Sequence, residues 1–260
     1  MQERHTDYER YFRESEESCD KHYIPFLKEH IPLFQNAPYD ILEVGCGIGG
    51  NIAPYASMGH RVTGIDIDAN SIDWAKKIFL QRGLSGRFIH GDIHEYEDDS
   101  HYQLIVMHDV IEHIADKHRL MLRLQELIAD DGVLYVAFPA WRMPFGGHQQ
   151  VARTKFVSRC PFIHLLPRKL FVWLLRQLGE SRGVIEDFLN IRDTRMTIQG
   201  FEKLCHKTGY KLIKQRLYFI NPHYEAKFGI KPRILWKGIA GIPYIRDYFT
   251  TSYHCILRRR

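Results

Sequence analysis

The sequence predicts an α/β fold with a doubly wound, mostly parallel sheet, a helical extension before it and an insertion after the fifth strand. From Tyr39 onward, short apolar runs alternate with segments of helical periodicity, as in sheets covered on both faces. The chain has 260 residues, 45% of them hydrophobic, which suits a large α/β domain. We expect residues 1–38 to form the extension and residues 39–260 the domain, with 142–200 as the insertion.

The predicted elements follow in chain order. Residues 6–35 indicate one or two helices, because apolar and aromatic side chains recur among charged ones until Pro32 and Pro38. The runs YDILEVG, RVTGID, RFIHGD, YQLIVMHDV and GVLYVAFP predict five strands. Helices are predicted from about Gly49, over Ala69–Gln81 and over about Ile114–Ala129. Gly132 marks the expected boundary between the last of these helices and the fifth strand.

The rhythm changes in the insertion. WRMPFGGHQQ has loop composition, and residues 167–179, PRKLFVWLLRQLG, predict a helix with basic residues at the edges of an apolar side. A helix is expected to end at Gly209, and the runs YKLIKQRLYFI and TSYHCILRR predict two further strands.

Cysteine usage and the first residues argue for a cytoplasmic protein. The five cysteines are scattered, odd in number and without metal-ligand spacing, so neither a disulfide framework nor a zinc knuckle is indicated. The first residues are charged and lack the apolar run of a signal peptide.

Charge is divided between the two halves of the chain. Residues 1–141 hold 13 basic and 24 acidic side chains, whereas residues 142–260 hold 23 basic and 7 acidic ones. One interpretation is that the halves attract each other or present solvated faces. The other is that the basic half meets an anionic substrate or an anionic membrane surface. Nucleic acid is not expected, because the basic residues are spread out and no nucleic-acid motif accompanies them.

A glycine-rich turn follows the first strand in LEVGCGIGGN. Gly45, Gly47 and Gly50 fit GxGxxG, and Asp66 follows 21 residues after Gly45, which is also the dinucleotide fingerprint of an NAD-dependent oxidoreductase. However, Glu43 lies two residues before the first glycine. A carboxylate there would repel a pyrophosphate, and it would favour a sulfonium and an α-ammonium group.

The four segments LEVGCGIGG, VTGID, HGD and LIVMHDVIEHI together resemble the class I S-adenosylmethionine (SAM)-dependent methyltransferases, over about residues 39–140. The resemblance implies the Rossmann-like fold of that family and SAM as the cofactor. It implies that glycines line the methionine end, that Asp66 holds the ribose hydroxyls and that His108 lies in the floor of the methyl-donor pocket. The cofactor-binding residues so implied are Glu43, Gly45, Cys46, Gly47, Gly49, Asp66, Ile67, Asp92, Ile93, His108 and Asp109.

The segment DVIEHI resembles the metal-associated E-x-x-E-H array of ubiquinone-biosynthesis-type O-methyltransferases, with the shorter Asp109 in the first position. Two carboxylates and an imidazole suit Mg²⁺ or Zn²⁺. The alternative is that Glu112 caps the following helix and His113 packs under the sheet edge. We expect SAM as the cofactor, assign no metal ligand, and keep His113 as a second catalytic candidate.

His148, in PFGGHQQ, is the first catalytic candidate. It follows the fifth strand, where acceptor-binding residues are expected, and an imidazole suits a general base near neutral pH. The alternative is a lid loop in which His148 only hydrogen-bonds to backbone.

We therefore expect a methyltransferase that modifies a small-molecule acceptor at oxygen, with lipid-linked and anionic acceptors included. A SAM-binding protein without turnover stays open as an alternative. The apolar and basic segments 167–179 and 234–249 are expected to form a lid over the SAM site; the alternative is peripheral contact with a membrane. The first of these is too short and too charged to span a bilayer. The sequence does not specify the oligomeric state.

Overall fold

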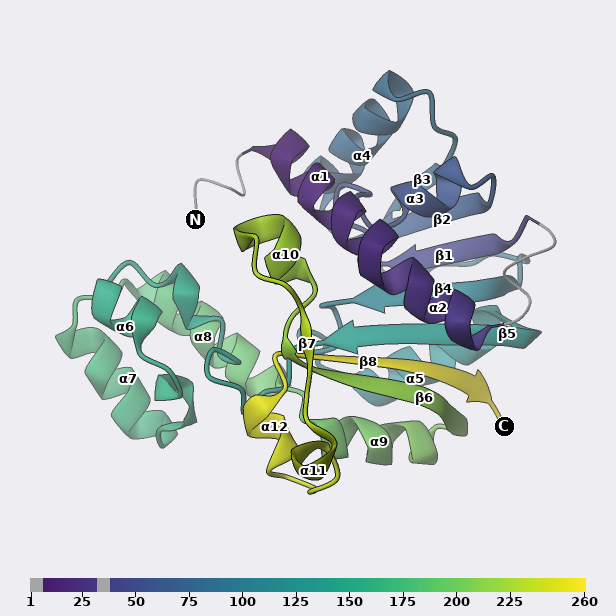
Figure 1. Ribbon diagram of the computed structural model, residues 1–260. Helices are drawn as coiled ribbons and strands as arrows, with labels where there is room; N and C mark the ends of the chain where they lie inside the picture. Colours follow the sequence, from purple (N-terminus) through teal and green to yellow (C-terminus); the bar gives the residue numbers. More distant parts are fainter. Residues whose placement is uncertain (1–6, 32–37) are drawn as a thin grey trace.

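A computed structural model describes residues 7–31 and 38–260, and it shows an eight-stranded sheet between two layers of helices (Figure 1). The strand order is β3-β2-β1-β4-β5-β8-β6-β7. Strands β1 to β5 are parallel, whereas β8 runs antiparallel to β5 and β6, and β7 runs antiparallel to β6. The predicted α/β, doubly wound and mostly parallel sheet is confirmed. The strands are β1 (Asp40–Val44), β2 (Arg61–Asp66), β3 (Arg87–His90), β4 (Tyr102–His108), β5 (Ile128–Phe138), β6 (Tyr210–Ile220), β7 (Arg233–Ile234) and β8 (Ser252–Arg259).

Helices precede, connect and extend the sheet. They are α1 (Tyr8–Ser18), α2 (Ile24–His30), α3 (Ala53–Ser57), α4 (Ala69–Gln81), α5 (Lys117–Leu127), α6 (Lys155–Arg159), α7 (Arg168–Gln177), α8 (Arg182–Thr194), α9 (Ile198–Lys207), α10 (His223–Phe228), α11 (Lys237–Ala240) and α12 (Arg246–Phe249). A π-helical segment, Cys19–Tyr23, joins α1 to α2, so the two helices form one continuous rod. The proline expected to end this region, Pro32, lies outside the described residues.

Apolar side chains on both faces of the strands explain why helices cover both. In β5, Tyr135 packs into a core with α1, α2 and α4, whereas the adjacent Leu134 and Val136 pack into a second core with α5 and α9. A strand buried on both faces is apolar throughout, which is why these strands read as continuous apolar runs.

Local signals set several boundaries. Helix α4 has the predicted bounds because Asp68 caps it, accepting hydrogen bonds from the backbone N–H groups of Asn70 and Ser71. The helix predicted from Gly49 begins only at Ala53, so that prediction is wrong. Gly132 lies inside β5, not at its start: the register with β4 shifts there, and a Cβ would lie 2.8 Å from the carbonyl oxygen of Tyr102.

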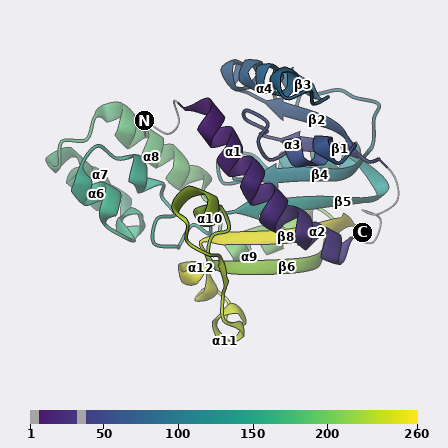
Figure 2. The ribbon, with the colours of Figure 1, turned by 45° about the horizontal axis from the view of Figure 1, so that its top comes forward.

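The insertion after β5 has a small core of its own. Helices α6, α7 and α8 lie beside the sheet and cover neither of its faces (Figure 2). Their buried apolar side chains Val157, Phe171, Leu175 and Phe188 contact one another and Ile163, which lies between α6 and α7. Across the ranges that the structure describes, no helix has the length and apolar character to cross a membrane. The proposed limits of the extension, domain and insertion stay predictions.

Candidate functional site

A cavity of about 460 Å³ lies where β1, β2 and β4 end. Ligands on open α/β sheets bind at this edge, beyond the carboxyl ends of the strands. The cavity is lined by ten of the residues singled out from the sequence, namely Gly45, Cys46, Gly47, Asp66, Ile67, Asp92, Ile93, His108, Asp109 and His113. The remaining three predicted residues, Glu43, Gly49 and His148, are not in its lining.

The glycine turn after β1 forms one wall of the cavity, and it packs closely against the end of β2 and the segment that follows β4. Gly45 has φ +69°, and a Cβ at this position would lie 2.3 Å from Cγ2 of Val110. Its N–H donates to the carbonyl oxygen of Ile65 at the end of β2. Gly49 also has a positive φ, but it faces the rings of Phe79 and Phe88 in the core, which places it behind the cavity.

Asp66 ties the glycine turn to the end of β2. Its Oδ2 accepts a 2.7 Å hydrogen bond from the N–H of Gly47, and its Oδ1 accepts one of 2.9 Å from the N–H of Asp68. The next side chain, Ile67, is 77% exposed although it is large and apolar. An exposed isoleucine bordering a cavity offers an apolar surface to a flat ligand.

Glu43 lies at the end of β1 beneath the turn and is 1% exposed. Burial raises the pKa of its carboxyl well above the ordinary value; the nearby Asn51 side chain lowers that pKa and the charge of Asp66 raises it. A buried acid with so high a pKa gains from a cation placed close to it.

His108 ends β4, Asp109 follows it, and both side chains line the cavity. The ring of His108 stacks on that of Tyr23 with centroids 4.1 Å apart, and burial lowers the pKa of His108 to about 3. Asp109 has the left-handed φ of 51°, and enclosure by the protein raises its pKa to about 6. The imidazole of His108 in the cavity wall is therefore neutral at pH 7.

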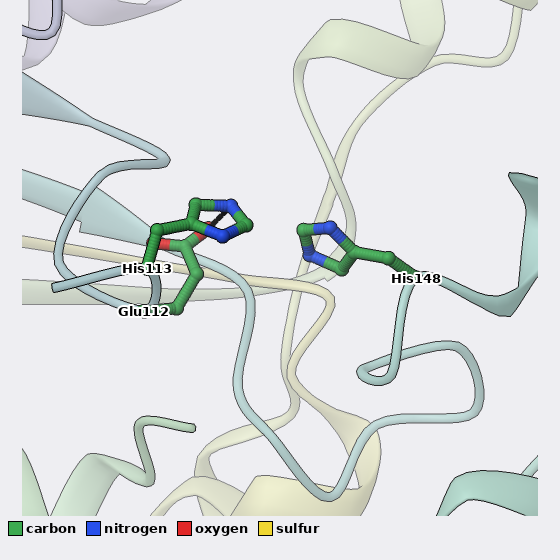
Figure 3. Close-up of side chains that lie close together, drawn as sticks. All are labelled: Glu112, His113 and His148. Atoms are coloured by element: carbon green, nitrogen blue, oxygen red, sulfur yellow. Dashed lines mark ion pairs between the residues drawn. The ribbon is translucent and has the colours of Figure 1, made fainter. Parts of the chain in front are cut away.

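His148 lies in the loop after β5 and does not line the cavity, but its ring lies beside that of His113, which does. The rings of His113 and His148 point toward each other over Glu112 (Figure 3), and one ligand atom from each of the three side chains lies within 4.8 Å of the others. Burial lowers the pKa of His148 to about 4, with smaller contributions from His113 and His164. Burial also lowers the pKa of His113. Both imidazoles are therefore neutral at pH 7 and offer lone pairs.

Glu112 completes this histidine–glutamate cluster (Glu112, His113 and His148). It is 4% exposed, and within the described chain neither of its carboxylate oxygens has a hydrogen-bond partner. Burial, followed by the charge of Asp109, raises its pKa well above the ordinary value. The alternative that Glu112 caps the next helix is wrong, because Asp116 caps α5. His113 does not pack under the sheet edge either, since its side chain is 44% exposed.

Four further lining residues come from segments that the sequence analysis did not assign to a site. Tyr11 and Ser15 lie one helical turn apart on α1, Tyr23 precedes α2, and His223 begins α10. A hydrogen bond of 3.0 Å between Ser18 Oγ and His223 Nδ1 joins the two segments. The spacing of Tyr11 and Ser15 was the available signal, since it places two polar groups on one side of an amphipathic helix.

The comparisons with known proteins agree with this architecture. A methyltransferase domain family profile matches residues 18–215. The ubiquinone biosynthesis O-methyltransferase of Rickettsia typhi is 32% identical over 116 residues, which cover 44% of this chain and 47% of the Rickettsia protein. The chain thus matches less than half the length of this curated relative.

Solved methyltransferases share the fold at low sequence identity. A SAM-dependent methyltransferase from Clostridium acetobutylicum superposes with a TM-score of 0.58 at 11% identity, covering 95% of this chain and 92% of that one. The plantazolicin methyltransferase BamL, solved with S-adenosylhomocysteine and a triazolic desmethylPZN analogue, superposes with a TM-score of 0.54 at 16% identity, covering 95% of this chain and 84% of that one.

The sheet order and the cavity beyond the parallel strands define a doubly wound α/β fold with a ligand-binding site at the carboxyl edge of its sheet. The chain belongs to the class I SAM-dependent methyltransferase family, because the profile covers most of its length. The comparisons do not favour the alternative of an NAD-dependent oxidoreductase.

Proposed function

We propose that this protein transfers the methyl group of SAM to an oxygen atom of a small-molecule acceptor. The observation that carries the proposal is one cavity lined by the glycine turn, by two acidic strand ends and by His113, the member of the histidine–glutamate cluster that reaches it. The glycine turn and the strand ends suit a cofactor with a cationic methionine end, and the cluster suits an acceptor that must lose a proton.

The cofactor fits the cavity in one direction. Gly45 and Gly47 leave room for the methionine end, and its ammonium group is a cation that would stabilise the buried carboxylate of Glu43. The ribose hydroxyls would bond to Asp66, and the adenine would lie between Ile67 and the segment after β3. Asp92 and Ile93 border that position.

Methyl transfer is an in-line displacement in which the acceptor oxygen attacks the methyl carbon. The carbon–sulfur bond breaks, and its electron pair returns to sulfur, which leaves neutral S-adenosylhomocysteine. The protein therefore has to align the reactants and exclude water, and a base takes the hydroxyl proton. We assign this role to His148, whose imidazole is neutral at pH 7 and lies beside His113.

The histidine–glutamate cluster also fits a divalent cation. Two neutral imidazoles and a buried carboxylate without a hydrogen-bond partner are a donor set of the kind that binds Zn²⁺ or Mg²⁺ through nitrogen and oxygen. Glu112, His113 and His148 would hold the ion, in place of the Asp109-containing set suggested by the sequence. A bound divalent cation would lower the pKa of an acceptor hydroxyl, and His148 would then serve as a ligand.

The test is turnover with radiolabelled SAM and matched acceptors that differ in one atom. Phenols, alcohols, the corresponding amines and the corresponding O-methyl ethers would be supplied together with the protein, and products analysed by mass spectrometry. We expect S-adenosylhomocysteine and O-methyl products from hydroxylated acceptors only. Methylation of amines or carbon would overturn the choice of oxygen. Tight S-adenosylhomocysteine binding without any methylated product would favour the SAM-binding protein without turnover.

A further inference from the structure

The segment that connects β6 to β8 pairs with the edge of the sheet through β7, and we define residues 228–249 as the apolar projection. It contains β7, α11 and α12; α11 lies at the far end of the segment in Figure 2, and its Ile239 and Ala240 pack against the core that includes residues of α9 (Figures 1 and 2). Its first part runs on directly from α10, where His223 lines the cavity.

Large apolar side chains are exposed along the whole projection. Trp236 is 73% exposed, Ile234 62% and Tyr244 56%. The other exposed apolar side chains of the projection are Phe228, Ile230, Ile242, Ile245, Tyr248 and Phe249. Single exposed apolar residues are normal, but so many in one short projection mark a surface that another phase or molecule covers.

The exposed charges of the projection have one sign. Lys231, Arg233 and Lys237 are exposed, and none of them forms an ion pair with a described residue. The single acid of the projection, Asp247, is fully buried and accepts hydrogen bonds from Arg142 and from the N–H of Ile198. The surface therefore presents aromatic and aliphatic groups together with uncompensated cations.

The insertion continues this surface. The ring of Phe162, which is 40% exposed, lies 6.3 Å from that of Tyr248. On α7, Leu170 and Trp173 are exposed beside Lys169, so the same combination of residues recurs there. The buried side of the insertion packs into its own core, which does not account for these outward-facing groups, and the lid expected from the sequence stays a prediction.

We propose that the projection docks on the surface of an anionic bilayer, with Trp236 and Tyr244 entering the headgroup layer and Lys231, Arg233 and Lys237 contacting anionic headgroups. Amphipathic aromatic rings and flanking cations are the groups that favour this interface. A symmetric contact with a second copy would bring the three cations of each copy together, which disfavours that occupant.

The test is vesicle flotation of the full chain, which does not depend on turnover. Vesicles of phosphatidylcholine alone would be compared with vesicles that also contain about one-third phosphatidylserine, at low and high salt. We expect binding to the anionic vesicles only, weakened by salt. The Trp236→Ala/Tyr244→Ala variant and the Lys231→Glu/Arg233→Glu/Lys237→Glu variant should each lower the partition coefficient at least tenfold.

Matched controls change the same kinds of residue elsewhere. Leu80, which is 81% exposed, and Lys76 lie on α4, so Leu80→Ser and Lys76→Glu should leave binding unchanged. Circular dichroism would check that each variant is folded. Failure of the unmodified chain to float, or equal loss in the control variants, would overturn the proposal. Sedimentation equilibrium showing a dimer that Trp236→Ala dissociates would assign the surface to a second copy instead. Each of these outcomes leaves the proposed methyl transfer unaffected.

Discussion

The rings of His113 and His148 meet edge to face, with centroids 5.2 Å apart, although they follow two different strands. β4 and β5 are parallel neighbours, so the loops after them emerge at the same sheet edge. Because both imidazoles face the buried carboxylate of Glu112, we expect His113→Ala and His148→Ala each to lower kcat about 100-fold or more, while the Kd for S-adenosylhomocysteine stays within about twofold.

The control for both variants is His118→Ala, which removes an exposed imidazole from α5. Chelation separates the two roles of His148. Loss of turnover with EDTA, restored by Mg²⁺ or Zn²⁺, assigns the cluster to a cation; full turnover in EDTA assigns His148 as base. Full activity in both histidine variants would remove the cluster from the mechanism.

Asp66 and Asp68 provide a matched pair for the cofactor site. Asp66 lines the cavity and accepts the N–H of Gly47, whereas Asp68 caps α4 outside the cavity. We expect Asp66→Ala to raise the Kd for S-adenosylhomocysteine at least tenfold, about 1.4 kcal/mol. Asp68→Ala should cost about 1 kcal/mol of folding free energy and leave that Kd nearly unchanged. Calorimetric titration and urea unfolding measure the two quantities, and equal effects on Kd would contradict the assignment.

The glycine turn allows a second matched comparison, between Gly45 and Gly47. Both have positive φ, so alanine at either position costs about 1–2 kcal/mol of backbone strain. Only at Gly45 does the new Cβ collide with Val110, because the surroundings of Gly47 are open. We expect Gly45→Ala to lower the free energy of unfolding clearly more than Gly47→Ala, measured in urea without ligand. Equal destabilisation would show that the approach of Val110 does not constrain the turn.

Acid sensitivity should arise partly from His164, which is 1% exposed. Burial lowers its pKa from 6.5 to about 4, although the carbonyl oxygen of Trp141, 2.8 Å from Nε2, opposes the shift. Between these two pKa values the unfolded chain binds more protons, so stability decreases as the pH falls from about 6.5 to 4, by at most about 1.4 kcal/mol per pH unit.

His164→Asn should therefore flatten the decrease, whereas His118→Asn should not. Urea unfolding at a series of pH values measures how the free energy of unfolding depends on pH. His148, with a pKa of about 4, contributes with the same sign, and Asp109, with a pKa of about 6, contributes with the opposite sign between pH 3.8 and 6. A slope that is identical in His164→Asn and the unmodified chain would contradict the role of His164.

Much of the sheet and of the cavity lining was predictable because the relevant signals are local. Strand periodicity, the cap at Asp68 and the glycine turn each depend on a few neighbouring residues. The short α3 was not predictable, because the backbone after Gly49 first has to pass the rings of Phe79 and Phe88. The strand boundary predicted at Gly132 is wrong because a glycine is required there by the close approach of the neighbouring strand β4.

The part of the site that the sequence did not indicate depends on contacts between distant segments. Tyr11 and Tyr23 reach the cavity because helices α1 and α2 lie across the sheet (Figure 1). The local sequence of a helix does not determine where that helix packs on a sheet. Likewise, the sequence placed His113 with Asp109, and only the loop after β5 brings His148 to it. Contacts between side chains that are distant in the sequence cannot be predicted from the residues next to each of them.

The pairing of the first helices with α10 has a consequence for how the protein is made. His22 Nε2 lies 2.9 Å from Glu225 Oε2, and Ser18 contacts His223, so one wall of the cavity joins two segments that lie far apart in the sequence. During synthesis, the glycine turn and the acidic strand ends leave the ribosome long before His223 does. A nascent chain would therefore have the cofactor's anchoring groups while that wall is still missing, and the wall would form only after α10 has left the ribosome.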